Sequence, residues 1–296
     1  MKQQAAYRNS IFALLTVQAA FGTFPVIGKA ILAWIPSTTL VGFRVGITAL
    51  ILYSFQRWRS DLRLQRRSDY LRLAILSLFG VTFNQLLFVG GLAFTKASNT
   101  SLLAVTIPIF TILIGWLWGS EKLTWLKLVG IAFAAAGVLM VIDPRKASFT
   151  SETTIGDLMI VANSLSFGTY VATSKDVVTR NGPMRSITWI FLFAAAVCVP
   201  LGAYTSIGVE LSSMPPLIWA AIIHAAVLAT ALPYFLNAWA IARVDPSTVA
   251  VFIYLQPLIG FIMAAIFLGE SIGPAFIAAS LMIFAGVFIV TRRTSR

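Results

Sequence analysis

One stretch of the amino-acid sequence occurs twice, and this repeat limits what the chain can fold into. Residues 98–141 align with residues 247–290 without a gap, at a constant offset of 149 positions. The matching positions hold a proline inside an apolar run, an acid at its end and a glycine inside the next run: Pro108 and Pro257, Glu121 and Glu270, Gly137 and Gly286. Chance similarity between two apolar segments would not align these three residue types.

A second match lies upstream of the first. Residues 21–29 align with residues 167–175 at an offset of 146 positions, and each segment has a glycine flanked by aromatic residues and ends in a lysine. Because the two matches together involve both halves of the chain, they predict two homologous structural units, residues 1–149 and residues 150–296.

The composition excludes a water-soluble fold. Hydrophobic residues make up 58% of the chain and charged residues 11%, with a mean hydropathy of +0.88, whereas soluble domains carry about 25% charged residues. The net charge of +12 could suggest a nucleic-acid surface. The basic residues lie between apolar runs, however, as in membrane proteins. We therefore expect a lipid bilayer as a partner and no nucleic acid.

Ten apolar runs are close to the length of about 20 residues that a membrane-spanning helix needs. The first run resembles a secretory signal, but it continues past the candidate cleavage site and part of it recurs in the second half, so we interpret it as a span. Five spans per half is an odd number, which predicts that the two repeats are inverted. The all-α membrane fold is predicted to have spans at residues 10–32, 37–56, 70–94, 99–118, 124–142, 156–178, 184–205, 216–242, 247–268 and 273–291.

The basic residues predict the orientation of these spans. If the N-terminus is cytoplasmic, the inner loops hold most of the 22 lysine and arginine residues, among them the arginines of the loop 56–69. The outer side then holds only three: Lys96, Arg145 and Lys146. Basic residues favour cytoplasmic loops, so we expect a multi-pass protein of the inner membrane with both termini inside. The arginine-rich loop is interpreted as a topology anchor, with contact to anionic lipid or nucleic acid as the alternative.

These motifs resemble the drug/metabolite transporter superfamily, specifically its ten-helix bacterial members with two EamA-type repeats. The resemblance spans almost the whole chain and rests on Gly22 with Lys29, on Phe43 with Arg44, and on the repeated proline, acid and glycine. Family members of this length include metabolite and amino-acid exporters, so the resemblance implies transport out of the cell without specifying a substrate. Ile190 stands where a second copy of Arg44 would fall, so the role of this arginine is not duplicated.

Polar and aromatic residues inside the spans are the candidates for a substrate cavity. Transporters with inverted repeats bind the substrate near the bilayer midplane, between the repeats, and an unpaired amide is costly to bury. For the amides the alternative is pairing between helices, and for the glycines it is close packing. We expect a cavity lined by Gln18, Phe21, Gly22, Phe24, Asn84, Asn163, Phe167, Gly168, Tyr170, Tyr234, Asn237, Tyr254 and Gln256.

Prolines and basic residues inside the spans are candidates for moving parts. Pro108 and Pro257 each remove a backbone hydrogen bond and should bend their helices, so we interpret them as hinges, with tolerated kinks as the alternative. Lys29 and Lys175, near the ends of their spans, are expected either to snorkel to the interface or to act as gates. Arg44 is expected to pair with protein groups rather than with the substrate.

The remaining ionisable residues in or beside the spans are interpreted as structural. Glu121 and Glu270 are expected to interact with the positive N-terminal ends of the helices that directly follow them. His224 has no cysteine or acid at ligand spacing, so neither a metal site nor a cofactor is expected. The sequence contains no nucleophile elbow, no zinc-protease motif and no pair of acids in the middle of a span. No enzyme is therefore expected.

The sequence favours an exporter of small amphipathic metabolites, with amino acids as the preferred class, working by alternating access. All ten acidic residues lie in loops or at span ends, so no carboxylate-based ion coupling is expected. A transporter of cationic drugs or sugar derivatives is the alternative, followed by an intramembrane enzyme or a channel. We expect a monomer that acts on a small-molecule substrate.

Overall fold

The computed structural model describes residues 2–59, 61–95, 100, 103–142, 153–259 and 274–291. Within these ranges the secondary structure is entirely helical, in agreement with the predicted fold class. Six helical segments are long and apolar enough to cross a membrane, judged by length and composition: residues 7–32, 37–59, 67–94, 154–173, 183–205 and 216–241. Four shorter apolar helices cover residues 106–117, 125–140, 246–259 and 277–291. The count of ten spans stays a prediction.

The elements of the predicted first half are long helices with one π-helical turn. They are α1 (Lys2–Leu32), α2 (Ser37–Arg59), α3 (Arg67–Ser77), the π-helical turn η1 (Leu78–Thr82), α4 (Phe83–Phe94), α6 (Thr106–Leu117) and α7 (Trp125–Ile142).

Among the described residues, the predicted second half has a similar order of elements, with the short helix α9 and two 3-10 turns in addition. They are α8 (Thr154–Thr173), α9 (Lys175–Asn181), α10 (Pro183–Thr205), the 3-10 turn η3 (Leu211–Ser213), α11 (Pro216–Ala226), the π-helical turn η4 (Val227–Ala231), α12 (Leu232–Ile241), α13 (Pro246–Val251), the 3-10 turn η5 (Phe252–Tyr254) and α15 (Pro274–Thr291).

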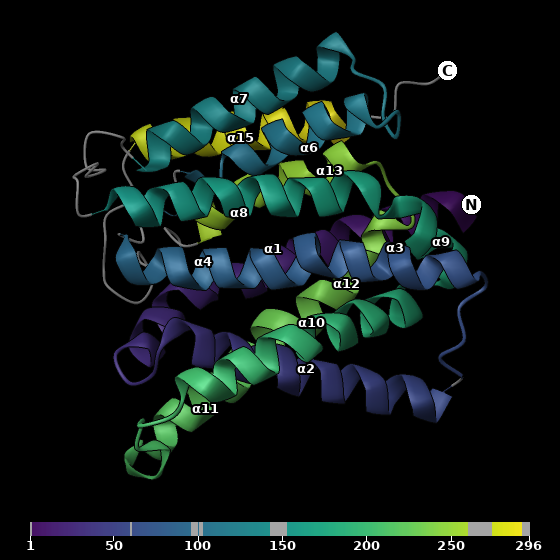
Figure 1. The fold of residues 1–296 in the computed structure, drawn as a ribbon. Coiled ribbons are helices and arrows are strands. Elements are labelled where there is room, and N and C mark those ends of the chain that lie inside the picture. Colours follow the sequence, from purple (N-terminus) through teal and green to yellow (C-terminus); the bar gives the residue numbers. More distant parts are fainter. Residues whose placement is uncertain are drawn as a thin grey trace.

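The helices lie side by side in one bundle, with α7 and α15 at one edge and α2, α10 and α11 at the other (Figure 1). The start of α1 and the end of α15 lie at the same end of this bundle, where the Tyr7 hydroxyl donates a hydrogen bond to the Thr291 carbonyl. This arrangement agrees with termini on one side of a membrane. That the side is cytoplasmic stays a prediction.

Helices α7 and α15, which lie 149 positions apart in the sequence, pack directly on each other. A Cβ atom added to Gly137 would lie 2.7 Å from the Ala279 carbonyl oxygen, and one added to Gly130 would lie 3.0 Å from the Gly286 carbonyl oxygen. Small residues allow this close backbone approach between membrane helices. In the repeat alignment Gly130 corresponds to Ala279 and Gly137 to Gly286, so the contacts are reciprocal. Reciprocal contacts are expected when a twofold axis relates two units.

Two predicted spans contain a π-helical turn instead of a continuous α-helix. The sequence predicts uninterrupted helices over residues 70–94 and 216–242, but η1 and η4 interrupt them at positions 149 residues apart. A π-helical turn inserts one residue into the helix and frees a backbone carbonyl, and such turns are frequent at functional sites. A further predicted span, residues 156–178, is divided into α8 and α9 at Ser174.

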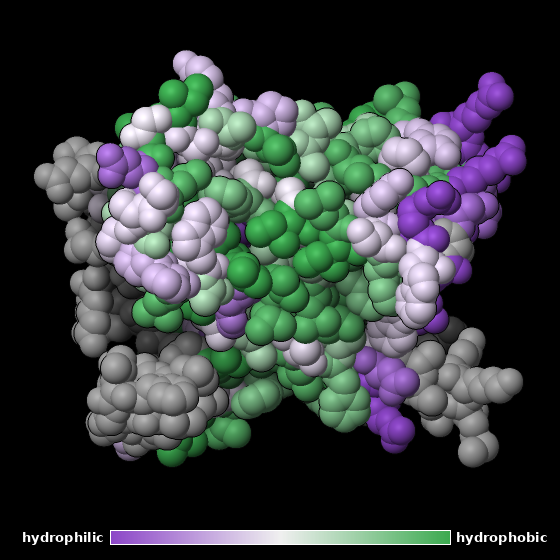
Figure 2. All heavy atoms as spheres, turned by 90° about the horizontal axis from the view of Figure 1, so that it is seen from below, coloured by the Kyte–Doolittle hydropathy of each residue, from purple (hydrophilic) through white to green (hydrophobic). Residues whose placement is uncertain are grey.

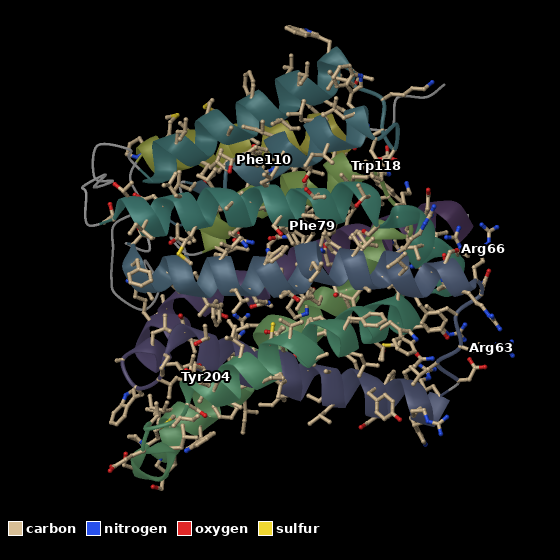
Figure 3. All side chains as sticks on the ribbon, in the orientation of Figure 1. Arg63, Arg66, Phe79, Phe110, Trp118 and Tyr204 are labelled. Atoms are coloured by element: carbon tan, nitrogen blue, oxygen red, sulfur yellow. The ribbon has the colours of Figure 1, made fainter. Side chains whose placement is uncertain are left out.

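The surface divides into an apolar middle and hydrophilic ends. Figure 2 shows apolar residues over the centre of one face and the most hydrophilic residues gathered toward one end. Arg63 and Arg66, both exposed, lie at the end that also carries the start of α1 (Figure 3). Trp118 lies toward this end and Tyr204 toward the opposite end (Figure 3), and their side chains are 72% and 73% exposed. Tryptophan and tyrosine favour the membrane–water interfaces, so this distribution fits a bundle that crosses a bilayer.

Candidate substrate cavity

A cavity lies between helices of both predicted halves. Its walls come from α1, α2, α4, the start of α6, α8, α12, α13 and η5. It offers about 80 Å³ to the centres of water molecules, whereas a single water needs about 10–15 Å³ on this measure. The cavity therefore has the size for a small metabolite. The predicted cavity residues that line it are Gln18, Phe21, Phe24, Asn84, Asn163, Phe167, Tyr234, Asn237 and Gln256.

A hydrogen-bond network joins one wall of the cavity to η1. The Tyr234 hydroxyl lies 2.7 Å from Asn84 Oδ1 and 3.1 Å from the Gly80 carbonyl oxygen, and it accepts a bond from Gln85 Nε2 at 3.1 Å. Asn163 Nδ2 donates to the Asn84 carbonyl oxygen at 2.8 Å. Lining a cavity and pairing between helices, which the sequence left as alternatives, therefore occur together in these side chains.

Helix α8 lies between η1 and α6, and the labelled Phe79 and Phe110 mark its two sides (Figure 3). Ser166 Oγ of α8 donates to the Phe79 carbonyl oxygen at 2.8 Å. This bond satisfies a second backbone acceptor of the π-helical turn with a neutral hydroxyl. The segment formed by η1 and α4 is thus held by neutral donors from α8 and α12.

A second amide pair connects the first and last helices of the cavity. Gln256 Nε2 donates to Gln18 Oε1 at 2.8 Å. Aromatic rings complete the walls: Phe21 meets Tyr234 edge-on with ring centroids 5.9 Å apart, and the ring centroid of Phe24 lies 6.1 Å from that of Phe88. The cavity therefore combines fixed amides with apolar rings, which suits a solute with one polar and one apolar end.

Arg44 of α2 enters the cavity wall from the side of η4. Its Nε atom donates to Thr230 Oγ1 at 3.0 Å and its Nη2 atom to the Ala229 carbonyl oxygen at 3.2 Å. Its guanidinium carbon lies 3.7 Å from the ring centroid of Phe24. Arg44 thus pairs with protein groups, and it also lines the cavity.

Two predicted cavity glycines lie outside the cavity lining. A Cβ atom on Gly22 would meet Ile259 Cγ2 at 3.5 Å, so Gly22 faces the helical segment that follows η5. A Cβ atom on Gly168 would meet Phe110 Cβ at 3.0 Å and the Thr111 nitrogen at 3.1 Å. Both glycines therefore serve close helix packing, which is the alternative the sequence left open.

Two predicted cavity tyrosines are also placed elsewhere. Tyr170 is 1% exposed and its ring covers Gly80, where an added Cβ atom would lie 2.6 Å from Tyr170 Cδ2. Tyr254 donates its hydroxyl hydrogen to the Val105 carbonyl oxygen at 3.0 Å. Neither tyrosine belongs to the lining of this cavity, and Tyr254 instead lines a smaller pocket that shares Ile253 and Gln256 with it. Substrate contact by Tyr170 and Tyr254 stays a prediction.

The two repeated prolines each follow a distorted helical turn. Pro108 is the third residue of α6, and just before it Ile107 N donates to the Ala104 carbonyl oxygen at 3.1 Å, in a tighter turn than an α-helix has. Pro257 follows the 3-10 turn η5. Each proline lacks the N–H group that would continue an α-helical ladder, so the helix is interrupted there. The use of Pro108 and Pro257 as hinges stays a prediction.

The two basic residues predicted as gates belong to the end of α1 and the start of α9, and these two helix ends lie at opposite ends of the bundle (Figure 1). Lys29, near the end of α1, donates from Nζ to the Thr95 carbonyl oxygen at 2.9 Å. Lys175, at the start of α9, has its Nζ atom 3.3 Å from Asp245 Oδ1. Each lysine is tied to a connection between helices, and a gating role stays a prediction.

Glu121 binds a different helix from the one that the sequence indicates. Its Oε2 atom accepts a hydrogen bond from the Ser247 backbone nitrogen at 3.0 Å, at the start of α13, and its Oε1 atom contacts Ser247 Oγ and Lys127 Nζ. The expected cap on the following helix, α7, is therefore wrong, because the side chain turns toward an N-terminus of the other half. Glu270 lies outside the described residues.

Several lining residues were missed by the sequence interpretation. Phe88 lies four positions after Asn84, which places both on one face of α4, and this spacing could have identified it. Ile107, Val249 and Ile253 also line the cavity, but aliphatic residues are abundant in every span and carry no signal. In the described part of the chain, no three histidine, cysteine, aspartate or glutamate side chains lie close enough together to hold a metal ion.

Comparisons with known proteins identify the family. The EamA-like transporter family matches the chain twice, over residues 8–143 and 154–292. An "uncharacterized transporter" of Archaeoglobus fulgidus is 25% identical, over 86% of this chain and 87% of that protein. A "probable terminal-alkyne amino-acid exporter" of Streptantibioticus cattleyicolor is 23% identical, over 78% of this chain and 76% of that protein.

A crystal structure with 17% sequence identity superposes with a TM-score of 0.76 and covers 97% of both chains. This likeness concerns the fold alone. The two family matches together cover most of the chain, and the curated relatives that carry a functional name are transporters rather than enzymes. The chain therefore belongs to the EamA-like transporter family and is a multi-pass membrane transporter.

Proposed function

We propose that the protein exports small amphipathic metabolites, with amino acids as the preferred class, across the inner membrane. The observation that carries this proposal is the cavity between the two halves, where buried amides lie beside the rings of Phe21, Phe24 and Phe167. The size of the cavity and its mixed lining support a solute with a compact polar end and an apolar side chain. The named amino-acid exporter among the relatives supports the same class.

Alternating access is supported by contacts that tie the two halves together at one end. Glu121 connects the segment after α6 to the start of α13, and Lys127 lies 3.7 Å from Asp245 Oδ2 in the same cluster. In the proposed cycle these contacts break when the cavity opens toward this end, while the two inverted repeats rock against each other. The bends before Pro108 and Pro257 are proposed as the hinges.

Transport is proposed to run down the solute gradient, without ion coupling through carboxylates. Carriers coupled to protons usually keep an ionisable acid within the membrane. Among the described residues that line the cavity, none is an acid. The buried acids lie near helix ends and are already engaged: Asp69 with Arg180, Glu121 with Lys127, and Asp157 with Thr95.

Counterflow in proteoliposomes tests this function. Vesicles loaded with an unlabelled amino-acid mixture should accumulate labelled amino acids, and imposed pH or sodium gradients alone should produce no uphill accumulation. Phe167→Ala should reduce counterflow strongly, because it removes a cavity wall, whereas Leu165→Ala on the exposed side of α8 should not. Strong transport of dicationic drugs with none of amino acids would contradict the proposal.

A further inference from the structure

Arg44 carries a buried positive charge that the protein leaves without a counter-ion. The residue is 2% exposed and lies within the membrane-spanning helix α2. No carboxylate among the described residues forms an ion pair with it; its hydrogen-bond acceptors, Thr230 Oγ1 and the Ala229 carbonyl oxygen, are neutral. A charged side chain is costly in a membrane interior and normally finds a partner or marks a functional site. The charge is therefore available to something that enters the cavity.

The guanidinium group of Arg44 also has N–H donors that no described protein group accepts. Of its five N–H groups, one on Nε and one on Nη2 are used, and Nη1 is buried without any hydrogen-bond partner. Arg44 belongs to the lining of the cavity. An unmatched donor in a buried wall costs stability unless a ligand satisfies it. A planar group with two acceptor oxygens, such as a carboxylate, matches the geometry of these donors.

The surroundings hold the guanidinium group in a defined orientation. The Thr230 hydroxyl donates to the Ala225 carbonyl oxygen at 2.7 Å, so its oxygen is directed to accept from Arg44 Nε. The Phe24 ring supports the guanidinium plane from one side, with 3.7 Å between the guanidinium carbon and the ring centroid. A donor that is fixed before binding loses less entropy when the ligand arrives. The site is thus prepared for an anion before the solute enters.

We propose that Arg44, as a residue of the cavity lining, binds the carboxylate group of the transported solute, and that a free carboxylate is the feature by which the cavity selects its substrates. This inference rests on the proposed export of amphipathic metabolites and specifies their charged end. The apolar side chain of the solute then lies against Phe21 and Phe167, which line the same cavity. Cations without a carboxylate are repelled by the uncompensated charge.

The test compares three probes of the same size and apolar side chain in counterflow with the full-length protein. Leucine has a carboxylate and an ammonium group, 4-methylpentanoate has the carboxylate alone, and leucinamide has the ammonium group alone. In the wild-type protein, leucine and 4-methylpentanoate should compete with labelled leucine, and leucinamide should not. In Arg44→Gln, the preference for leucine over leucinamide should fall by about tenfold or more, as loss of a hydrogen bond to a charged group predicts.

Arg243→Gln is the matched control, because Arg243 also stacks on an aromatic ring, with its guanidinium carbon 3.9 Å from the Trp239 centroid, but lies outside the cavity. Its preference for leucine should equal that of the wild type. Arg44→Lys, which keeps the charge but not the planar fork, should recover part of the preference. An unchanged preference in a folded Arg44→Gln variant would overturn the inference.

A measurement on the wild-type protein covers the case in which Arg44 variants do not fold. Leucine and 4-methylpentanoate should each raise the melting temperature in detergent, and leucinamide should not, because a ligand that binds the native state stabilises it. Equal stabilisation by leucinamide would refute the role of the carboxylate while leaving amino-acid transport intact. Failure of all amino acids to bind and to be transported would instead refute the proposed function itself.

Discussion

The π-helical turns η1 and η4 occupy equivalent positions in the two predicted repeats, but different side chains satisfy their backbones. At η1 the carbonyl oxygen of Gly80 accepts a hydrogen bond from the neutral hydroxyl of Tyr234. At η4 the carbonyl oxygen of Ala229, 149 positions later, accepts one from the cationic guanidinium of Arg44. The same backbone distortion is thus combined with a neutral partner on one side of the cavity and a charged partner on the other. Two similar halves can in this way form a site whose two sides differ in charge.

Contacts between equivalent positions lie close to the cavity. Gln85 and Tyr234 are equivalent by the offset of 149 and are hydrogen-bonded to each other, and so are Val105 and Tyr254. Equivalent positions touch when the axis that relates two units passes between them. The cavity would then lie on this axis. Three sets of variants test whether η1 and η4 differ in packing and in hydrogen bonding.

The largest effect is expected from the packing of η1. In Gly80→Ala the new Cβ atom would lie 2.6 Å from Tyr170 Cδ2, so the ring or the helix must shift, at a cost of up to about 3 kcal/mol. The equivalent residue at η4 is already an alanine, and Ala229→Gly should cost only about 1 kcal/mol. Thermal unfolding of both variants in detergent measures the difference. Equal melting temperatures would show that the two turns are packed alike.

A smaller effect is expected from the neutral partner of η1. Tyr234→Phe leaves the Gly80 carbonyl oxygen and the side chains of Asn84 and Gln85 without the hydroxyl they share, at a cost of about 2 kcal/mol. Tyr254→Phe, which loses a single bond to a backbone carbonyl, should cost about 1 kcal/mol. Chemical unfolding followed by tryptophan fluorescence can rank the two. A Tyr234→Phe variant as stable as Tyr254→Phe would argue against a shared network at η1.

The smallest effect is expected from Thr230, which positions Arg44 at η4. Thr230→Val removes the acceptor of Arg44 Nε and should raise the KM for leucine about fivefold, the equivalent of about 1 kcal/mol, with the maximal rate unchanged. Thr230→Ser keeps the hydroxyl and should resemble the wild type. Initial rates of counterflow at several leucine concentrations provide both constants. A fall in maximal rate with an unchanged KM would show that Thr230 does not act through substrate binding.

Many of the cavity residues could be predicted from the sequence because an amide in an apolar run is conspicuous. Asn84, Asn163 and Asn237 stand out in this way, and each lies in the lining. The glycines Gly22 and Gly168 were assigned to the cavity because a missing side chain permits the approach of either a ligand or a helix. A sequence cannot distinguish these two neighbours. The structure places helices there.

The membrane class, the helical fold and the repeat can be read from the sequence, because run length, composition and residue spacing are local properties of the chain. The partner of each polar group follows from the packing of the helices. The tertiary structure places Glu121 at the start of α13 rather than α7, and Arg44 at the Ala229 carbonyl oxygen of η4. It also reveals the π-helical turns, whose carbonyl oxygens accept hydrogen bonds from side chains of distant helices. These outcomes depend on residues more than 100 positions apart, and a local pattern carries no information about such contacts.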